Sequence, residues 1–196
     1  HFVEWQIASG SATVADTGIA STTVNLQTGD ATVVAVFALN TYQLTVNAGI
    51  GGTITVPAVS PVSVDHGVAV SIEAATDVGY HFVEWQIASG SATVADTGDA
   101  STTVNLQSGD ATVVAVFALN TYQLTVNAGI GGTISVPTLS PTTVGHGVST
   151  SIEASANVGY YFVEWQIASG SATVADTGDA STTVNLQSGD ATVVAV

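Results

Sequence analysis

The sequence predicts an all-β fold of small antiparallel domains arranged in tandem. Three observations support this prediction: apolar and polar residues alternate, glycine and proline interrupt the alternation at short intervals, and the whole pattern recurs along the chain. Alternation at a period of two is typical of strands with one buried face, whereas an amphipathic helix has a period of 3.6 residues. We expect about six short strands in each domain, forming a β-sandwich or a β-grasp-like fold.

The repeat has a period of 80 residues, because the phrase FVEWQIASGSATVADTG begins at Phe2, at Phe82 and at Phe162. This period exceeds the roughly 20 to 45 residues of a solenoid repeat and suits a small domain with its own core. Because the sequence opens and closes within a repeat, we expect it to belong to a longer array. The predicted units are the C-terminal half of a repeat at 1–40, a complete repeat at 41–120 and a nearly complete repeat at 121–196.

Consecutive repeats are separated by very short junctions. Between Phe117, near the end of one repeat, and Tyr122, near the start of the next, only residues 118–121 intervene. A flexible linker of the Gly/Ser type needs a longer stretch of chain. We therefore expect neighbouring domains to contact one another and to be stiffly coupled.

The repeat opens with a predicted hairpin. Apolar and polar residues alternate over 42–47, and a second short alternating segment follows at 53–56. The glycine-rich segment between them, 47–52, is typical of a turn because glycine adopts the backbone conformations that turns need. The two strands are therefore predicted to pair with each other.

The middle of the repeat predicts two further strands separated by turns. Two prolines bracket a loop at 57–61, and a His-Gly turn at 66–67 precedes an alternating strand at 68–73. Another turn, at 77–79, leads into a strand at 80–87.

The last two strands are predicted at 101–107 and 111–118, with a turn at 108–110 between them. Both faces of the final strand are apolar, because Val114 and Val116 lie opposite the face formed by their odd-numbered neighbours. Such a strand is either central and covered on both sides, which is the commoner arrangement, or part of an interface with a neighbouring domain or chain. In the second case Val114 and Val116 are the interface residues.

The composition excludes several classes of partner. The chain has no Lys, Arg or Cys, and its 15 acidic residues give a net charge of −15. Binding to nucleic acid or to an anionic membrane depends on Lys and Arg, so neither partner is expected. Without cysteine there are no disulfides and no thiolate metal sites. The longest apolar run, 113–119, is far shorter than the roughly 20 residues that span a bilayer, so membrane insertion of this segment is not expected.

Five short motifs follow one another in the complete repeat: Tyr-x-Leu-x-Val, Gly-Gly-x-Ile, His-Gly-Val-x-Val-x-Ile-x-Ala, Gly-Tyr-x-Phe-x-x-Trp and Ala-Val-Phe. In the complete repeat they begin at Tyr42, Gly51, His66, Gly79 and Ala115. The ordered set resembles the divergent internalin B-type repeat of bacterial surface proteins, from which this chain departs by lacking the usual Lys and Arg. The resemblance implies small β-rich modules strung in arrays on secreted or cell-surface proteins, and it implies no catalytic residues.

The aromatic residues of the repeat have two candidate roles. An exposed Trp85 would stack on a sugar ring, whereas a buried one would anchor the core, as the resemblance implies. We favour the second role and assign Tyr80, Phe82, Trp85 and Phe117 to the core. Glu84, beside Trp85, would suit a glycosidase acid only with a second carboxylate about 5 to 9.5 Å away, and the sequence nominates none.

Two carboxylates share one glycine-containing loop in each of the later repeats. They are Asp96 with Asp99 and Asp176 with Asp179, whereas Ile19 replaces the second aspartate in the first unit. Calcium takes 6 to 8 oxygen ligands, so a Ca²⁺ site is one interpretation of this loop. The loop matches no established calcium-binding spacing, and an ordinary Asx turn is the simpler interpretation. No other cofactor is expected.

The sequence thus predicts an acidic bacterial structural protein, extracellular or on the cell surface, that forms a stalk, fibre or filament and is not an enzyme. Its partners would be neighbouring repeats or further copies of itself, with adhesion to cell surfaces or glycans as an added role. The alternative is an array of carbohydrate-binding modules, in which each domain adds avidity for a glycan. Exposed aromatic planes would distinguish this alternative from the structural role.

Overall fold

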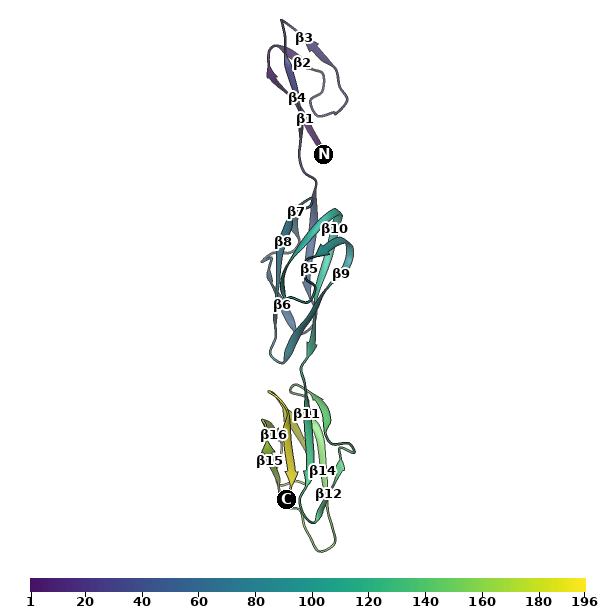
Figure 1. Ribbon diagram of the computed structural model, residues 1–196, viewed down its shortest axis with the longest axis vertical. Helices are drawn as coiled ribbons and strands as arrows, with labels where there is room; N and C mark the ends of the chain where they lie inside the picture. The colour runs from purple at the N-terminus through teal and green to yellow at the C-terminus, as the bar shows by residue number, and fades with distance from the viewer.

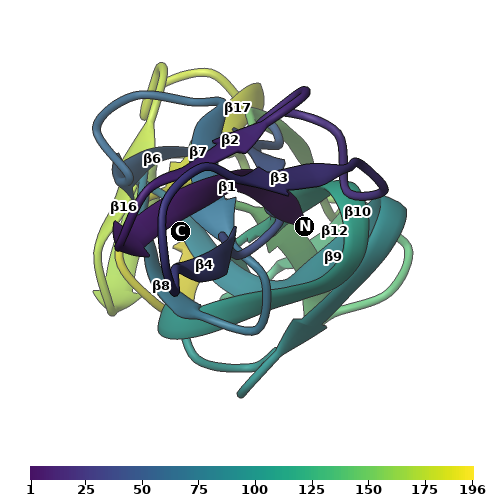
Figure 2. The same ribbon diagram turned by 90° about the horizontal axis from the view of Figure 1, so that it is seen from above.

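The computed structural model describes residues 1–196 as a rod of β-rich units that contains no helix (Figure 1). We call residues 1–40 the first unit, 41–120 the middle domain and 121–196 the last domain. The three follow one another along the long axis, and the view from above places them over one another (Figure 2). The prediction of tandem all-β domains is confirmed. With no helix present, none is long and apolar enough to cross a membrane.

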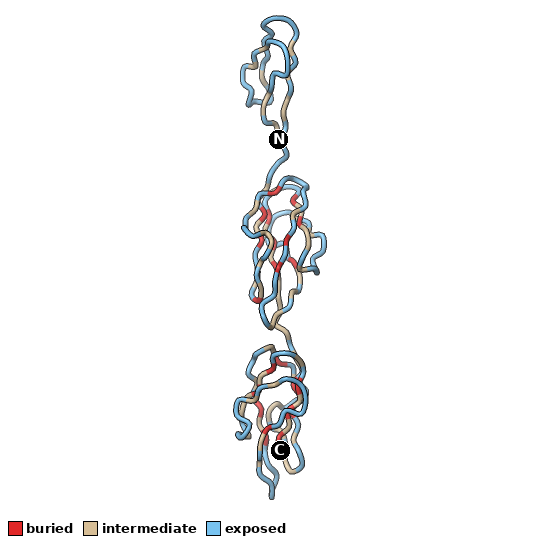
Figure 3. Tube along the Cα trace, turned by 90° about the vertical axis from the view of Figure 1, so that its left-hand side faces the viewer, coloured by how far each residue is buried: buried red, intermediate tan, exposed pale blue.

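The first unit consists of two small sheets. Its strands are β1 (Phe2–Ser9), β2 (Ala12–Val14), β3 (Val24–Leu26) and β4 (Thr32–Phe37). β1 pairs with β4 and β2 with β3, both antiparallel. No residue of this unit is buried, and Leu26 and Phe37 expose 63% and 69% of their surface. Figure 3 shows the contrast with the other two units, where buried residues follow the strands.

The middle domain has six strands in one continuous sheet, and two of them are long enough to connect its two halves. They are β5 (Thr41–Ala48), β6 (Gly52–Val56), β7 (Val62–Asp65), β8 (Ala69–Thr76), β9 (Tyr80–Val94) and β10 (Ser101–Leu119). The order is β6-β8-β10-β5-β7, and β9 pairs along β10. The first part of β10 pairs with β8 and its second part with β5, and a register shift between Leu106 and Ala111 marks the change.

The last domain shows the same arrangement as two separate four-stranded sheets. Its strands are β11 (Thr121–Ala128), β12 (Gly132–Val136), β13 (Thr142–Gly145), β14 (Thr150–Ala156), β15 (Trp165–Ser169), β16 (Ala172–Val174), β17 (Ser181–Leu186) and β18 (Ala191–Ala195). The sheets have the orders β13-β11-β18-β15 and β12-β14-β17-β16. Both sheets contribute to one buried cluster of 11 residues, so each domain is a β-sandwich.

One pairing in each domain departs from the expected antiparallel pattern. β5 lies parallel to β10, from Leu44 beside Ala111 to Ala48 beside Ala115, and β11 lies parallel to β18 in the same register. The first and last strands of a repeat become parallel neighbours because the chain crosses to the other sheet between them. As a result the chain enters a domain at one end and leaves it at the other (Figure 1).

The predicted hairpin between the first two strands is wrong. β5 pairs with β7 and β10, whereas β6 pairs with β8. The segment between β5 and β6 carries the chain from one sheet of the sandwich to the other, and the ring of Tyr80 lies against its Gly51. Alternation places the apolar side chains of both strands toward the interior in either arrangement, so it does not tell a hairpin from two strands that face each other.

A strand that the sequence did not predict follows the proline-bracketed loop. β7 covers 62–65 and forms the edge beside β5, and its Val64 is 3% exposed. Its four residues are too few for a clear alternation signal, and Pro61 directly before them indicates a loop. A proline at the start of an edge strand is tolerated because it removes no ladder hydrogen bond.

The core of the middle domain is entirely apolar. It contains 11 buried residues, and no polar or charged residue of the chain is buried. The buried residues are Leu44, Val46, Val64, Ile72, Ala74, Trp85, Val104, Leu106, Ala111, Val113 and Ala115. All of them lie within 41–120, so this stretch encloses its own core.

We predict that residues 41–120, expressed alone, fold as a β-rich monomer, because every strand that contributes to this core lies within that range. Far-UV circular dichroism and sedimentation would measure the strand content and the mass. Residues 1–40 are the control, and we expect them to remain unfolded alone, since none of them is buried. A disordered spectrum for 41–120 would mean that a neighbouring repeat completes the domain.

Candidate functional site

The tryptophan of each full domain is buried, and all three tryptophans donate a hydrogen bond to the same loop of their repeat. Trp85 is 2% exposed, and its Nε1 donates a hydrogen bond of 3.0 Å to the backbone carbonyl of Asp99. Trp165 repeats this bond to Asp179 at 3.0 Å, and Trp5 repeats it to Ile19 at 3.1 Å. Because the acceptor is a backbone carbonyl, the bond survives the change of side chain in the first unit.

Of the other aromatic residues assigned to the core, Phe82 and Phe117 are partly buried and pack against it, whereas Tyr80 belongs to no core cluster. Phe82 lies 5.7 Å from Trp85 and 5.9 Å from Phe117, measured between ring centroids. Tyr80 and Phe117 are half-buried, and their rings lie against glycines 51 and 52. These contacts leave the plane of Trp85 unavailable to a sugar ring.

The aspartate loop is a pair of Asx turns. Asp96 Oδ1 accepts a hydrogen bond from the backbone N–H of Gly98 at 2.9 Å, and Asp99 Oδ1 accepts one from Ser101 at 3.0 Å. The N–H of Asp96 in turn donates to Thr102 Oγ1 at 3.1 Å. One oxygen of each carboxylate thus holds the backbone of its own loop.

The corresponding loop of the last domain has the same geometry. Asp176 accepts from Gly178 at 2.9 Å, and Asp179 accepts from Ser181 at 2.9 Å. No group of three or more His, Asp or Glu side chains gathers anywhere in the structure to hold a metal ion. In this structure the loop forms the turn whose backbone carbonyl accepts the hydrogen bond from the tryptophan.

Val114 and Val116 lie on the outer face of a central strand. β10 runs between β5 and β9 at this point, and its inner residues Val113 and Ala115 are fully buried. Val114 and Val116 are only half-buried and belong to neither core cluster. The strand is therefore central, as one of the two interpretations of its sequence predicted. That interpretation also expected both faces to be covered, whereas the residues of its outer face are only half-buried.

The outer neighbours of these valines are polar. Val114 lies between Asn47 on β5 and Gln86 on β9, and Val116 lies beside Glu84. The side chain of Gln86 donates a hydrogen bond of 2.8 Å to Glu84 Oε1. The outer face of the strand is thus a narrow apolar stripe bordered by hydrogen-bonding groups.

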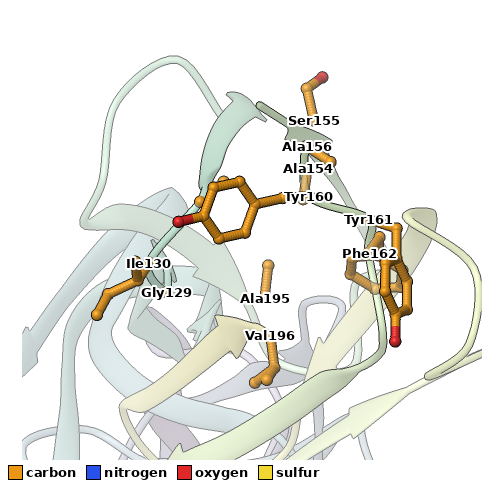
Figure 4. A pocket seen from close by; sticks show the side chains of 12 residues that line it. Gly129, Ile130, Ala154, Ser155, Ala156, Tyr160, Tyr161, Phe162, Ala195 and Val196 are labelled. Carbon is orange, nitrogen blue, oxygen red and sulfur yellow. The ribbon is translucent and has the colours of Figure 1, made fainter. Parts of the chain in front are cut away.

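A small cavity lies at the far end of the last domain (Figure 4). The residues that line it include Gly129, Gly132, Tyr160, Phe162 and Ala195. In the middle domain the ring of Phe117 lies against Gly52, which is the counterpart of Gly132. The cavity therefore occupies the place where an aromatic side chain packs in the middle domain, and it belongs to the packing of the repeat.

The junction between the two full domains is a single residue. β10 ends at Leu119 and β11 begins at Thr121, so only Asn120 lies between them. Its N–H donates to the carbonyl of Gly79 at 2.8 Å, and its own carbonyl accepts from the N–H of His146 at 2.8 Å. The sequence located this junction but gave no sign that Gly79 and His146 approach it.

A comparison with known families gives one match, which occurs twice. The model of the divergent InlB B-repeat domain matches residues 42–121 and again residues 122–196. No curated protein and no solved structure matches the chain. The two matched ranges together cover most of the sequence.

For the aspartate loop we predict that Asp99→Ile lowers the stability of the middle domain by about 0.5 to 1.5 kcal/mol, the net value of one hydrogen bond. The loss would come from the Asp99–Ser101 bond alone, since the tryptophan bond uses the backbone carbonyl. Thermal unfolding of 41–120 with added calcium, and again with a chelator, would measure it. If calcium raises the melting temperature of the wild type but not of the variant, the aspartates bind the ion and the purely structural role is wrong.

Proposed function

The chain belongs to the divergent InlB B-repeat family, whose members are found generally in bacterial surface proteins, and we propose that it is an extracellular structural protein. Its tandem domains form a stalk, surface fibre or matrix filament that holds other parts of the assembly at a distance. It performs this role through shape and stiffness and catalyses no reaction. Adhesion, where it occurs, is a property of the assembled array.

The parallel pairing of the first and last strands is the observation that supports this proposal most directly. Because β5 and β10 run in the same direction, the entry and the exit of a domain lie at opposite ends. Each further repeat then adds length to the molecule rather than folding back on it. The single-residue junction at Asn120 continues one domain directly into the next.

The charge of the chain suits an extended and exposed polymer. Its net charge is −15, with no Lys or Arg to form ion pairs, so neighbouring domains repel one another. This repulsion opposes collapse of the array and is screened by salt and divalent cations. The lack of Lys and Arg also removes every cleavage point for trypsin-like proteases.

The carbohydrate-binding alternative lacks the aromatic platform that it requires. Trp85 and Trp165 are each 2% exposed. The most exposed aromatic ring, that of Tyr161 at 81%, stands where the middle domain has His81 and is therefore not shared between repeats. An array that gains avidity needs the same site in each domain.

The proposed function predicts a thin, semi-rigid fibre with an axial repeat of about 30 to 40 Å, which is the size expected of a compact 80-residue domain. Electron microscopy of the native array would measure this spacing, and small-angle scattering of the 196-residue chain would measure its length in solution. A compact particle, or a flexible chain with no regular spacing, would contradict the structural proposal.

We also predict that replacing Val114 and Val116 together by Thr weakens chain-to-chain association while the domain stays folded. These side chains lie outside the core, so the change in stability should stay within about 0.5 kcal/mol. The matched control is Val113→Thr on the inner face of the same strand, which should cost about 1 to 3 kcal/mol because it buries a hydroxyl group.

Thermal unfolding of 41–120 would measure stability, and sedimentation or fibre bundling of the full chain would measure association. An unfolded double variant would show that the two valines are ordinary core residues. A folded double variant that associates as the wild type does would show that the contact between chains lies elsewhere.

A further inference from the structure

We infer that residues 145–147, the end of β13 and the turn after it, are a docking element for the preceding domain, and that position 145 determines how rigidly the two domains are held. The partner of this surface is the end of another repeat of the same chain. The inference rests on the proposed structural function. Its test measures motion between two domains of one chain, however, so it succeeds or fails independently of fibre formation.

The backbone of Asn120 is bound on both sides. One of its hydrogen bonds goes to Gly79 in the middle domain, and the other comes from His146 in the last domain, each at 2.8 Å. Its side-chain Oδ1 lies 2.8 Å from Nδ1 of His81. Rotation about this residue would break hydrogen bonds to one domain or the other, so these bonds favour a single orientation.

The ring of His146 fills the space above Gly79. A Cβ atom on Gly79 would collide with the His146 ring, so this approach depends on the glycine. On its other side the ring meets Tyr122 of its own domain, with the centroids 6.2 Å apart. The imidazole is thus held between the two domains.

The side chain of Leu119 packs against Gly145, in the space that a Cβ atom at this position would occupy. A Cβ atom built on Gly145 would stand 2.8 Å from Leu119 Cδ2 and 3.0 Å from Val148 Cγ2, both closer than ordinary contact. The φ angle of Gly145 is not in the left-handed region, so the backbone does not require glycine here. The glycine matters because it lets Leu119 pack against the following domain.

The preceding junction has the same backbone bond but a different residue at this position. The N–H of His66 donates to the carbonyl of Asn40 at 2.8 Å, as His146 does to Asn120. The counterpart of Gly145 is Asp65, and Leu39 is 56% exposed. A carboxylate does not offer an apolar leucine the contact that glycine permits.

Leu119 also pairs with Tyr80 within the middle domain. A substitution at 145 changes the docking contact and leaves this pairing intact. Position 145 is therefore the place to test.

The experiment measures the distance between the two domains in the 196-residue chain. The chain has no cysteine, so Ser71→Cys and Ser151→Cys, at exposed equivalent positions, give one spin label on each full domain. Pulsed electron paramagnetic resonance would report the width of the distance distribution. We expect a narrow distribution in the wild type and a broader one in Gly145→Asp.

The control for this variant is Asp65→Gly, the reverse change at the other junction, which should leave the 71–151 distribution unchanged. An equal width in the wild type and in Gly145→Asp would overturn the inference. So would an equal broadening in Asp65→Gly, because the effect would then not arise at the junction. Circular dichroism would establish that both domains remain folded.

The glycine beneath the imidazole offers a second, independent pair of variants. Gly79 and Gly159 occupy equivalent turns with φ angles of +86° and +88°, and only Gly79 meets a ring of the next domain. Replacing either by Ala should cause the same backbone strain. Only Gly79→Ala should also broaden the distance distribution, and equal distributions for the two variants would count against the docking role of the turn.

Discussion

The parallel pairing of the first and last strands of a repeat is the constraint on which the rest of the structure depends. β5 and β10 share the centre of one sheet and run in the same direction over Leu44 to Ala48 and Ala111 to Ala115. An antiparallel pair would return the chain to the end at which it entered. The parallel pair instead carries the chain through the domain, so a domain of this fold extends an array whenever it is duplicated.

This pairing also explains the organisation of the core. Between its first and last strands the chain must cross to the opposite sheet and return, and that crossing supplies the second layer of the sandwich. The buried face of β10 then lies against residues from both sheets, and Trp85 packs with it at the end of the domain. The chain has no cysteine and no buried polar or charged residue, so apolar packing and strand pairing stabilise each domain.

The junction turns a row of stable domains into a rod. Long-range repulsion between acidic domains keeps the array extended, but repulsion alone would leave it flexible. Orientation comes from short-range contacts: two backbone hydrogen bonds at Asn120 and the side chains packed against Gly79 and Gly145. Glycine matters at these two positions because the His146 ring and the Leu119 side chain occupy the space where a Cβ atom would stand.

The sequence by itself determined the repeat, the all-β class, the positions of most strands and the shortness of the junctions. These features follow from local patterns. The alternation of apolar and polar residues indicates which side chains point inward, and the 80-residue period indicates where a unit recurs. It did not determine which strands pair, because alternation is the same for a hairpin as for two strands facing each other, and the predicted pairing of 42–47 with 53–56 failed for that reason. The short strand at 62–65 was missed because its few residues gave too little pattern.

Only the tertiary structure decided that Val114 and Val116 face outward beside polar neighbours and that Gly79 and His146, distant in sequence, meet at Asn120. Contacts of this kind depend on the relative placement of whole sheets and domains, which no local pattern of residues encodes.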